Sequence, residues 1–138
     1  MFSLKTLLVS VVAAATAVSA QEAVRYGVVD VTPTELSAGS SFTVTYNSTL
    51  ARWQPEAVDF LLQRTANGQP TGGYVSLQRN DYAPDQTILS ADLQTPDLSK
   101  FGDGTNADWL LWAFITYPDS DSDLKLIGGS TSGQLTFA

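Results

Sequence analysis

Residues 108–117 are DWLLWAFITY, the longest apolar run in the chain beyond residue 20. Aromatic and β-branched residues dominate the run, and such residues favour strands. Side chains alternate between the two faces of a strand. One face would carry Trp109, Leu111, Ala113, Ile115 and Tyr117, and the other Leu110, Trp112, Phe114 and Thr116. Because both faces are apolar, the run predicts a central strand that is covered on both sides, or on one side with a binding surface on the other.

Shorter segments around this run also have strand patterns. Phe42, Val44 and Tyr46 alternate with polar residues, which is typical of a strand with one buried face. Residues 57–64, 74–78 and 87–93 are further predicted strands. About seven short strands, separated by turn signals and with no convincing long helix, predict an all-β fold. The architecture we expect is an antiparallel β-sandwich of the immunoglobulin-like kind.

Four details of this prediction are specific enough to be checked. Residues 24–31 are expected to form the first strand, with Val24, Tyr26 and Val28 on one face. Residues 66–73 (ANGQPTGG) are expected to form a loop, because Gly, Pro and Asn interrupt regular structure. Residues 95–106 are expected to be the longest irregular segment, and residues 118–123 a turn.

The first 20 residues have the pattern of a secretory signal peptide. Lys5 supplies a positive start, residues 7–18 are apolar, and Val18-Ser19-Ala20 places small residues at the cleavage site. The apolar stretch is shorter than the roughly 20 residues that span a membrane. We therefore expect cleavage before Gln21, a single domain over residues 21–138, and a secreted, extracellular protein with no membrane insertion.

Charge and composition exclude several kinds of partner and chemistry. The chain has 7 basic and 14 acidic residues, and loss of Lys5 with the signal peptide would leave a net charge of −8. This disfavours nucleic acids and anionic membranes, because both attract basic proteins. There is no Cys and no His. A Cys nucleophile, a Ser-His-Asp triad and a His-ligated metal site are therefore excluded, and we expect no cofactor.

Three segments resemble a known family. Residues 29–33 (VDVTP) and 38–46 (AGSSFTVTY) place a strand before Pro33, then a Gly-containing turn and a strand that ends in an aromatic residue. Residues 132–137 (SGQLTF) look like the last strand of the same domain. The pattern resembles the immunoglobulin-like N-terminal domain of Ser/Thr-rich fungal cell-wall proteins, some of which are linked to β-glucan assembly.

The resemblance covers most of the expected mature chain in layout. It implies an immunoglobulin-like fold and a small secreted fungal protein at the cell wall or in the extracellular space. The Ser/Thr-rich tail and lipid-anchor signal of the longer family members are not found here, so a free-standing protein is expected. The family supplies no catalytic residues that can be carried over, and we therefore expect a protein that is not an enzyme.

Aromatic side chains are the candidate binding residues. Trp53, Tyr74 and Tyr82 are predicted to bind a ligand, because aromatic rings pack against the apolar faces of sugar rings. The alternative is that these rings belong to the core, as aromatic residues of small domains commonly do. For Trp112 the core is our expectation, whereas for Trp53 both alternatives stay open. A third alternative is that the second apolar face of residues 109–117 contacts another protein or a second copy of this chain.

Asn47-Ser48-Thr49 is an N-glycosylation sequon. In a eukaryotic secretory route Asn47 is expected to carry a glycan. The alternative is a polar strand end that matches the motif without being modified.

Carboxylates provide the remaining candidate chemistry. Asp119, Asp121 and Asp123 alternate like the first ligands of a calcium loop, but Leu124 stands where such a loop needs Gly, and Ser130 where it needs Glu. These aspartates are therefore predicted to be turn residues, with a weak calcium site as the alternative. Asp59 is the best single catalytic candidate of a small hydrolase, which would need a second carboxylate at about 5–9.5 Å. Its alternative, which we favour, is the polar face of a strand.

These observations predict a non-catalytic protein with a binding or structural role. The expected partner is a cell-wall polysaccharide or an extracellular protein. An extracellular protein-interaction module or effector, and a small carboxylate-dependent hydrolase, are the two alternatives.

Overall fold

The computed structural model describes residues 24–67, 69–101 and 108–138. In these residues the chain forms nine strands and one short 3₁₀ helix. The strands are β1 (Val28–Thr32), β2 (Glu35–Leu36), β3 (Ser41–Asn47), β4 (Ala57–Ala66), β5 (Gln69–Asp81), β6 (Ile88–Gln94), β7 (Asp108–Pro118), β8 (Lys125–Thr131) and β9 (Leu135–Phe137). The helix, η1, spans Leu98–Lys100. The all-β prediction is confirmed.

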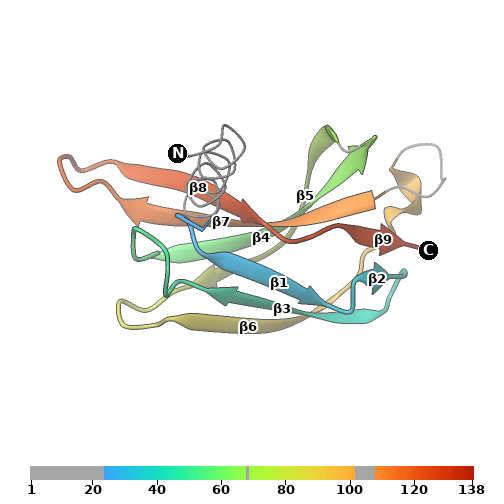
Figure 1. Cartoon of the computed structure of the whole chain (residues 1–138), viewed down its shortest axis with the longest axis horizontal. Helices are drawn as coiled ribbons and strands as arrows, with labels where there is room; N and C mark the ends of the chain where they lie inside the picture. The colour runs from blue at the N-terminus through green and yellow to red at the C-terminus, as the bar shows by residue number, and fades with distance from the viewer. Residues whose placement is uncertain (1–23, 68, 102–107) are drawn as a thin grey trace, which may run out of the picture.

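The strands form two sheets that lie against each other as in a β-sandwich (Figure 1). The small sheet has the order β1-β3-β6, and its strands are antiparallel. The large sheet has the order β2-β9-β7-β4-β5, and β8 also pairs with β7. Since β9 pairs with residues 108–109 and β8 with residues 112–118, both lie along the same edge of β7. The short pair β2 and β9 is parallel.

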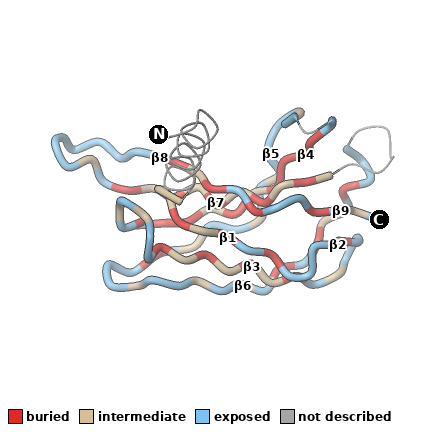
Figure 2. The backbone as a smooth tube through the Cα atoms, viewed as in Figure 1, coloured by how far each residue is buried: buried red, intermediate tan, exposed pale blue. Residues whose placement is uncertain are grey.

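The hydrophobic core lies between the sheets. Its members come from alternate positions of β1, β3, β4 and β7, and Figure 2 shows buried and more exposed positions alternating along these strands. Phe42, Val44 and Tyr46 face it from the small sheet, and Trp109 faces it from the large sheet. Burial of each large apolar side chain contributes about 1.5–3 kcal/mol. Because the chain has no Cys, it has no disulfides, and this core is its main source of stability.

β7 has the position that its sequence predicted. It pairs with β4 on one side and with β8 and β9 on the other, so it is an interior strand of the large sheet. Its odd-numbered residues from Trp109 to Tyr117 are buried, and its even-numbered residues from Asp108 to Thr116 are half-buried. The alternation is confirmed, and it gives the strand one core face and one outer face.

The predicted first strand was wrong in its start and in its buried face. Residues 24–26 form a turn, and β1 begins at Val28 and buries Val29 and Val31 instead of Val28. The reason is Gly27, whose φ of 99° breaks the extended chain. A Cβ on Gly27 would lie 2.5 Å from the ring of Tyr46, so this close approach requires glycine.

The predicted loop at residues 66–73 was also wrong. β4 and β5 continue as a long hairpin to Ala66 and Gln69, with Asn67 at a φ of 53° in the turn. In its described part, β5 pairs with β4 alone, so it is an edge strand, where Pro70 is tolerated. The register shift between Gln63 and Arg64 of β4 leaves Gly72 and Gly73 unpaired, as a β-bulge does.

The predicted signal peptide, residues 1–20, lies outside the described residues, as do residues 102–106 of the predicted irregular segment. Within the part of the chain that the structure describes, no helix is long and apolar enough to cross a membrane.

Candidate functional site

The outer side of the large sheet carries a cluster of aromatic side chains. Trp112 and Phe114 project outward from β7 and are half-buried. Leu61 of β4 lies directly opposite Trp112, and its side chain is therefore on the same face. Tyr74 of β5 contacts both rings from two strands away. We call Leu61, Tyr74, Trp112 and Phe114 the outer aromatic face.

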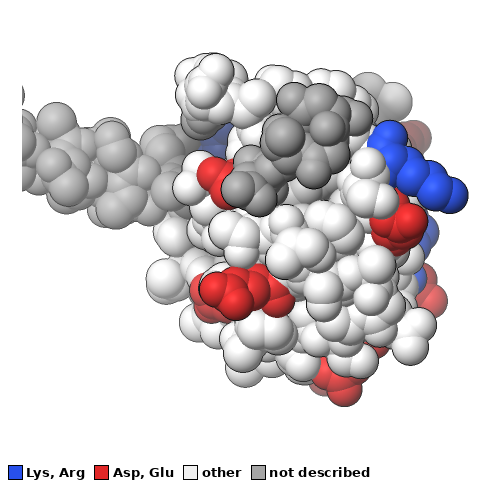
Figure 3. All heavy atoms as spheres, turned by 90° about the vertical axis from the view of Figure 1, so that its right-hand side faces the viewer, with Lys and Arg blue, Asp and Glu red and all other residues white. Residues whose placement is uncertain are grey.

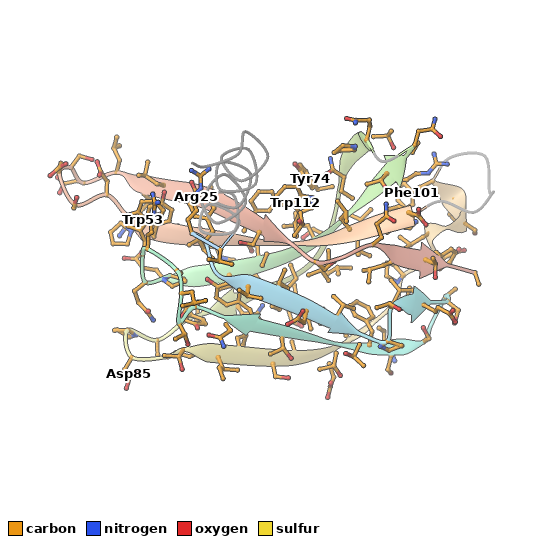
Figure 4. The ribbon with its side chains drawn as sticks, in the orientation of Figure 1. Arg25, Trp53, Tyr74, Asp85, Phe101 and Trp112 are labelled. Atoms are coloured by element: carbon orange, nitrogen blue, oxygen red, sulfur yellow. The ribbon has the colours of Figure 1, made fainter. Side chains whose placement is uncertain are left out.

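The rings of the outer aromatic face pack in fixed geometries. Trp112 and Phe114 stack with ring centroids 5.1 Å apart and an interplanar angle of 8°. Tyr74 meets Trp112 at 6.1 Å and 87°, and Phe114 at 5.3 Å and 90°, so both contacts are edge-on. Figure 4 shows Tyr74 and Trp112 next to each other on this side of the sheet. Tyr74 is 48% exposed and is the most accessible of these rings.

Gly129 of β8 makes room for these rings. It lies opposite Phe114, and a Cβ there would be 2.8 Å from the Phe114 ring and 2.9 Å from the Trp112 ring. The rings therefore lie directly over bare backbone. Gly128 and Gly129 are both regular members of β8.

Polar groups border the outer aromatic face. Trp112 Nε1 donates a hydrogen bond to Gln63 Oε1 at 2.9 Å. Asp59, opposite Phe114 on β4, forms an ion pair with Arg79 at 2.8 Å. Thr131 lies opposite Trp112, which places its hydroxyl group on the same side. Rings surrounded by amide, hydroxyl and charged groups can stack on a ring-shaped ligand and hydrogen-bond to its substituents.

The outer side of the small sheet is different, because it is polar. Thr45 of β3 lies between Asp30 of β1 and Ser90 of β6. Thr43 donates a hydrogen bond to Asp92 Oδ1 at 2.7 Å on the same side. The sandwich thus has one hydroxyl-rich outer face and one aromatic outer face. This asymmetry makes the large sheet the candidate binding surface.

Trp53 does not belong to the outer aromatic face. Its half-buried ring stacks on Tyr117 at 4.7 Å and on Tyr26 at 5.5 Å, and it packs against the core. The Arg25 guanidinium lies 4.7 Å from the centroid of the Tyr26 ring. Figure 4 places Trp53 and Arg25 together at one end of the sandwich, away from Tyr74. The stack attaches residues 25–26 to the large sheet, and this accounts for Trp53 structurally.

Tyr82 is a core residue and is not placed with Tyr74. It is 4% exposed, its hydroxyl donates to Ser48 Oγ at 2.8 Å, and its ring meets Tyr46 edge-on at 5.6 Å. Burial raises the pKa of the Tyr82 hydroxyl. Of the three predicted ligand-binding residues, the structure therefore brings Tyr74 alone to the outer aromatic face. Our expectation that Trp112 lies in the core was wrong, because its ring is on the outside of β7.

Asn47, the sequon residue, is the last residue of β3. Tyr46 faces the core, so the Asn47 side chain lies on the outer side of the small sheet. Its Oδ1 accepts a hydrogen bond from the Thr49 backbone N–H at 2.8 Å. A glycan here would leave from the polar side of the sandwich.

The carboxylates of the turn after β7 hold the turn together. Asp119 Oδ2 accepts a hydrogen bond from Ser122 Oγ at 2.7 Å, and the Asp119 N–H donates to the Leu124 carbonyl at 3.0 Å. Among residues 24–67, 69–101 and 108–138, no group of three or more carboxylates could hold a metal ion.

No family model matches the chain, and no curated protein matches it significantly in sequence. We therefore argue function from the geometry of the outer aromatic face.

Proposed function

We propose that this is a secreted, non-catalytic fungal protein with an immunoglobulin-like sandwich, and that its outer aromatic face binds polysaccharide at the cell wall or in the extracellular space. The supporting sequence features are the signal-peptide pattern and the resemblance to cell-wall domains. One structural observation carries the proposal. Tyr74, Trp112 and Phe114 pack with one another on the outside of the sheet, and none of them belongs to the core or to its packing shell.

The position of these rings has a physical cost that a binding role would explain. A small domain without disulfides depends on its apolar burial, yet it keeps three aromatic rings outside its core. Contiguous exposed apolar surfaces commonly mark binding sites. Sugar rings have apolar C–H faces that stack on aromatic rings, while their hydroxyl groups bond to polar neighbours such as Thr131 and Asp59. A sheet face also suits an extended polymer better than an enclosed cavity would.

The test is a fluorescence titration of the tryptophans with soluble β-glucan and chitin oligosaccharides. We expect a saturable change for the wild-type protein, and a roughly tenfold weaker affinity for Tyr74→Ala. Ile88→Ala is the matched control, because Ile88 is 55% exposed on the small sheet. If no sugar changes the fluorescence, or if both variants bind equally well, carbohydrate binding at this face is ruled out.

A protein partner is the second candidate, because exposed aliphatic side chains extend the apolar surface. Ile127 of β8 is 68% exposed and lies opposite Thr116, on the same side as Phe114. Light scattering tests its simplest form, association of two copies. A concentration-dependent dimer that Ile127→Asp abolishes would favour this candidate, and a monomer at all concentrations would count against a homodimer.

A further inference from the structure

An ion pair lies at the border of the outer aromatic face, beside one of its rings. Asp59 of β4 is opposite Arg79 of β5 and also opposite Phe114 of β7, so the three side chains form a row across neighbouring strands. Arg79 Nη1 donates a hydrogen bond to Asp59 Oδ2 at 2.8 Å. Tyr74, on the same strand as Arg79, contacts the Phe114 ring edge-on. A ligand that stacks on these rings would therefore meet the ion pair directly.

Both members of the ion pair have hydrogen-bonding atoms to spare. Within the described residues, Asp59 Oδ1 accepts no hydrogen bond, and the Arg79 guanidinium uses only Nη1. The Asp59 side chain is 29% exposed and the Arg79 side chain is 61% exposed, so a ligand in solution can reach both. A guanidinium carries several N–H donors, and a carboxylate accepts at both of its oxygens. The pair thus presents an acceptor and several donors next to each other.

The fold does not depend on this ion pair. Ion pairs between exposed side chains stabilise proteins very little, because water already solvates both charges well. Glu56 and Lys125 form a second exposed ion pair of the same length, 2.8 Å. Lys125 lies opposite Pro118, at the end of β7 and away from Phe114. The pair of Asp59 and Arg79 differs in its position beside the rings, which indicates a role in binding.

The pair matches two adjacent hydroxyl groups of a sugar ring. A hydroxyl group both donates and accepts hydrogen bonds. One hydroxyl group would donate to Asp59 Oδ1, while the hydroxyl group on the neighbouring carbon accepts from an Arg79 N–H. Both bonds would involve a charged group, and such bonds are stronger than bonds between neutral groups. The apolar side of the same sugar ring would stack on the outer aromatic face.

The charge of the protein favours a neutral glycan over an acidic one. The chain has 14 acidic residues and 7 basic residues. Figure 3 shows acidic side chains at several places on one end of the molecule, including next to basic ones. Such a surface repels polyanions. Because Asp59 already balances the charge of Arg79, the pair has no net positive charge to attract the carboxylate of an acidic sugar.

We propose that Asp59 and Arg79 make the outer aromatic face selective for neutral glycans whose internal sugar units keep two adjacent free hydroxyl groups. This inference rests on the function proposed above and names the class of glycan. Glucose units joined by β-1,4 bonds keep the hydroxyl groups on C2 and C3. A β-1,3 bond occupies the oxygen on C3 and leaves no adjacent pair inside the chain, and chitin has an acetamido group on C2.

Calorimetric titration with cellotetraose, tetra-N-acetylchitotetraose and laminaritetraose tests the inference. The first two sugars have the same linkage and differ only in the group on C2, whereas the third changes the linkage. We expect cellotetraose to bind about fivefold more tightly than either of the others. Asp59→Asn and Arg79→Gln should each remove this preference and leave the affinity for tetra-N-acetylchitotetraose unchanged. Tyr74→Ala should instead weaken the binding of all three sugars, because stacking does not require adjacent hydroxyl groups.

Glu56→Gln and Lys125→Gln are the matched controls. They remove the same charges from the other exposed ion pair, so both should keep the preference for cellotetraose. Thermal unfolding of each variant shows whether it is folded, and we expect all four charge variants to unfold at nearly the wild-type temperature.

Three outcomes would contradict the inference. Equal affinities of the wild type for the three sugars, or a preference that persists in both Asp59→Asn and Arg79→Gln, would overturn it while leaving carbohydrate binding at the rings in place. An equal loss of preference in Glu56→Gln would mean that net charge alone is responsible, and would also overturn it. If none of the three sugars binds, the proposed function fails together with this inference.

Discussion

Trp112 Nε1 donates a hydrogen bond to Gln63 Oε1 across 2.9 Å, from β7 to the neighbouring strand β4. Gln63 is a polar residue on the outer side of the sheet, yet it is only 7% exposed. An indole has a single polar hydrogen, so this bond fixes the rotation of the Trp112 ring. The stack of Trp112 and Phe114, and the edge-on contacts of Tyr74, depend on that rotation.

Removal of the acceptor should loosen the outer aromatic face. For Gln63→Leu we expect the free energy of unfolding to fall by about 1 kcal/mol, because the half-buried indole N–H loses its partner. Urea unfolding measures this loss, and the tryptophan emission spectrum should change with it. Gln94→Leu, at an exposed position of β6, is the control and should change neither quantity. An unchanged emission spectrum in Gln63→Leu would mean that the bond does not orient the ring.

A methyl group at position 129 should displace the rings. Because a Cβ on Gly129 would lie 2.8 Å from the Phe114 ring, Gly129→Ala should destabilise the protein by about 1–3 kcal/mol. It should also weaken any ligand that stacks on Trp112 or Tyr74. In Gly133→Ala the added Cβ meets nothing within 4 Å, so this variant should be as stable as the wild type. Thermal unfolding of both variants checks the prediction, and equal stability would contradict it.

The sequence predicted which residues of β7 share a face, but not which of the two faces meets the other sheet. Alternation determines which residues share a face, and Trp109 and Ile115 are buried as a consequence. It does not determine which face meets the second sheet, because both faces of this run are apolar. Trp112 was assigned to the core for that reason. Its actual position depends on β1 and β3, which lie far away in the sequence.

Glycine caused the other errors, in two different ways. Gly27 has a positive φ and shifts the inward positions of β1 by one residue, which a pattern of valines cannot reveal. At residues 69–73, Pro and Gly favour a loop, but an edge strand with bulges tolerates both. The rings of the outer aromatic face come from β5 and β7, and no sequence pattern indicates that Tyr74 contacts Trp112.

Alkaline pH should destabilise the protein through its buried tyrosines. Burial, and then the nearby Tyr82, raise the pKa of the Tyr46 hydroxyl far above its usual value of 10.0. This hydroxyl donates to the Tyr26 carbonyl at 2.8 Å. Above about pH 10 the unfolded chain loses this proton while the folded chain keeps it, so stability is complete below that pH and falls as the pH rises.

The variant Tyr46→Phe tests whether the Tyr46 hydroxyl causes this loss of stability at alkaline pH. The variant should lose about 1 kcal/mol at neutral pH with its hydrogen bond, but its stability should fall less steeply between about pH 9 and 11. Urea unfolding at several pH values gives both quantities. The same slope in variant and wild type would show that Tyr46 does not cause the alkaline loss.

Asp97 should stabilise the short helix η1. It is the N-cap of this helix, and hydrogen bonds from the Ser99 hydroxyl and then the Ser99 N–H hold the pKa of its carboxyl below the usual 3.8. A lowered pKa means that the carboxylate stabilises η1 above about pH 4, and that this contribution is lost as the pH falls below that value. Because Leu98 of η1 is buried in the core, loosening of η1 should lower the free energy of unfolding.

The measurement is urea unfolding at neutral pH and at about pH 3. We expect Asp97→Ala to be less stable than the wild type at neutral pH, and the difference to shrink at the lower pH. Asp85→Ala should be as stable as the wild type, since Asp85 is exposed at the other end of the sandwich (Figure 4). Equal stability of Asp97→Ala and wild type would show that the cap does not stabilise the protein.

Asn47 should carry a glycan that leaves the outer aromatic face open. Its side chain lies on the outer side of the small sheet, whereas Tyr74 and Trp112 lie on the outer side of the large sheet. Expression in a eukaryotic secretory host should give a mass that falls on treatment with an N-glycosidase. Asn47→Gln and Thr49→Ala should both abolish the difference, because the enzyme that attaches the glycan reads both residues of the sequon.

Binding then distinguishes the two faces. The glycosylated protein and its enzymatically deglycosylated form should bind β-glucan oligosaccharides with the same affinity, because the glycan and the rings leave opposite sides of the sandwich. A ligand bound to the small sheet would instead gain affinity when the glycan is removed. Such a gain would place the binding surface on the polar face and contradict the assignment to Tyr74, Trp112 and Phe114.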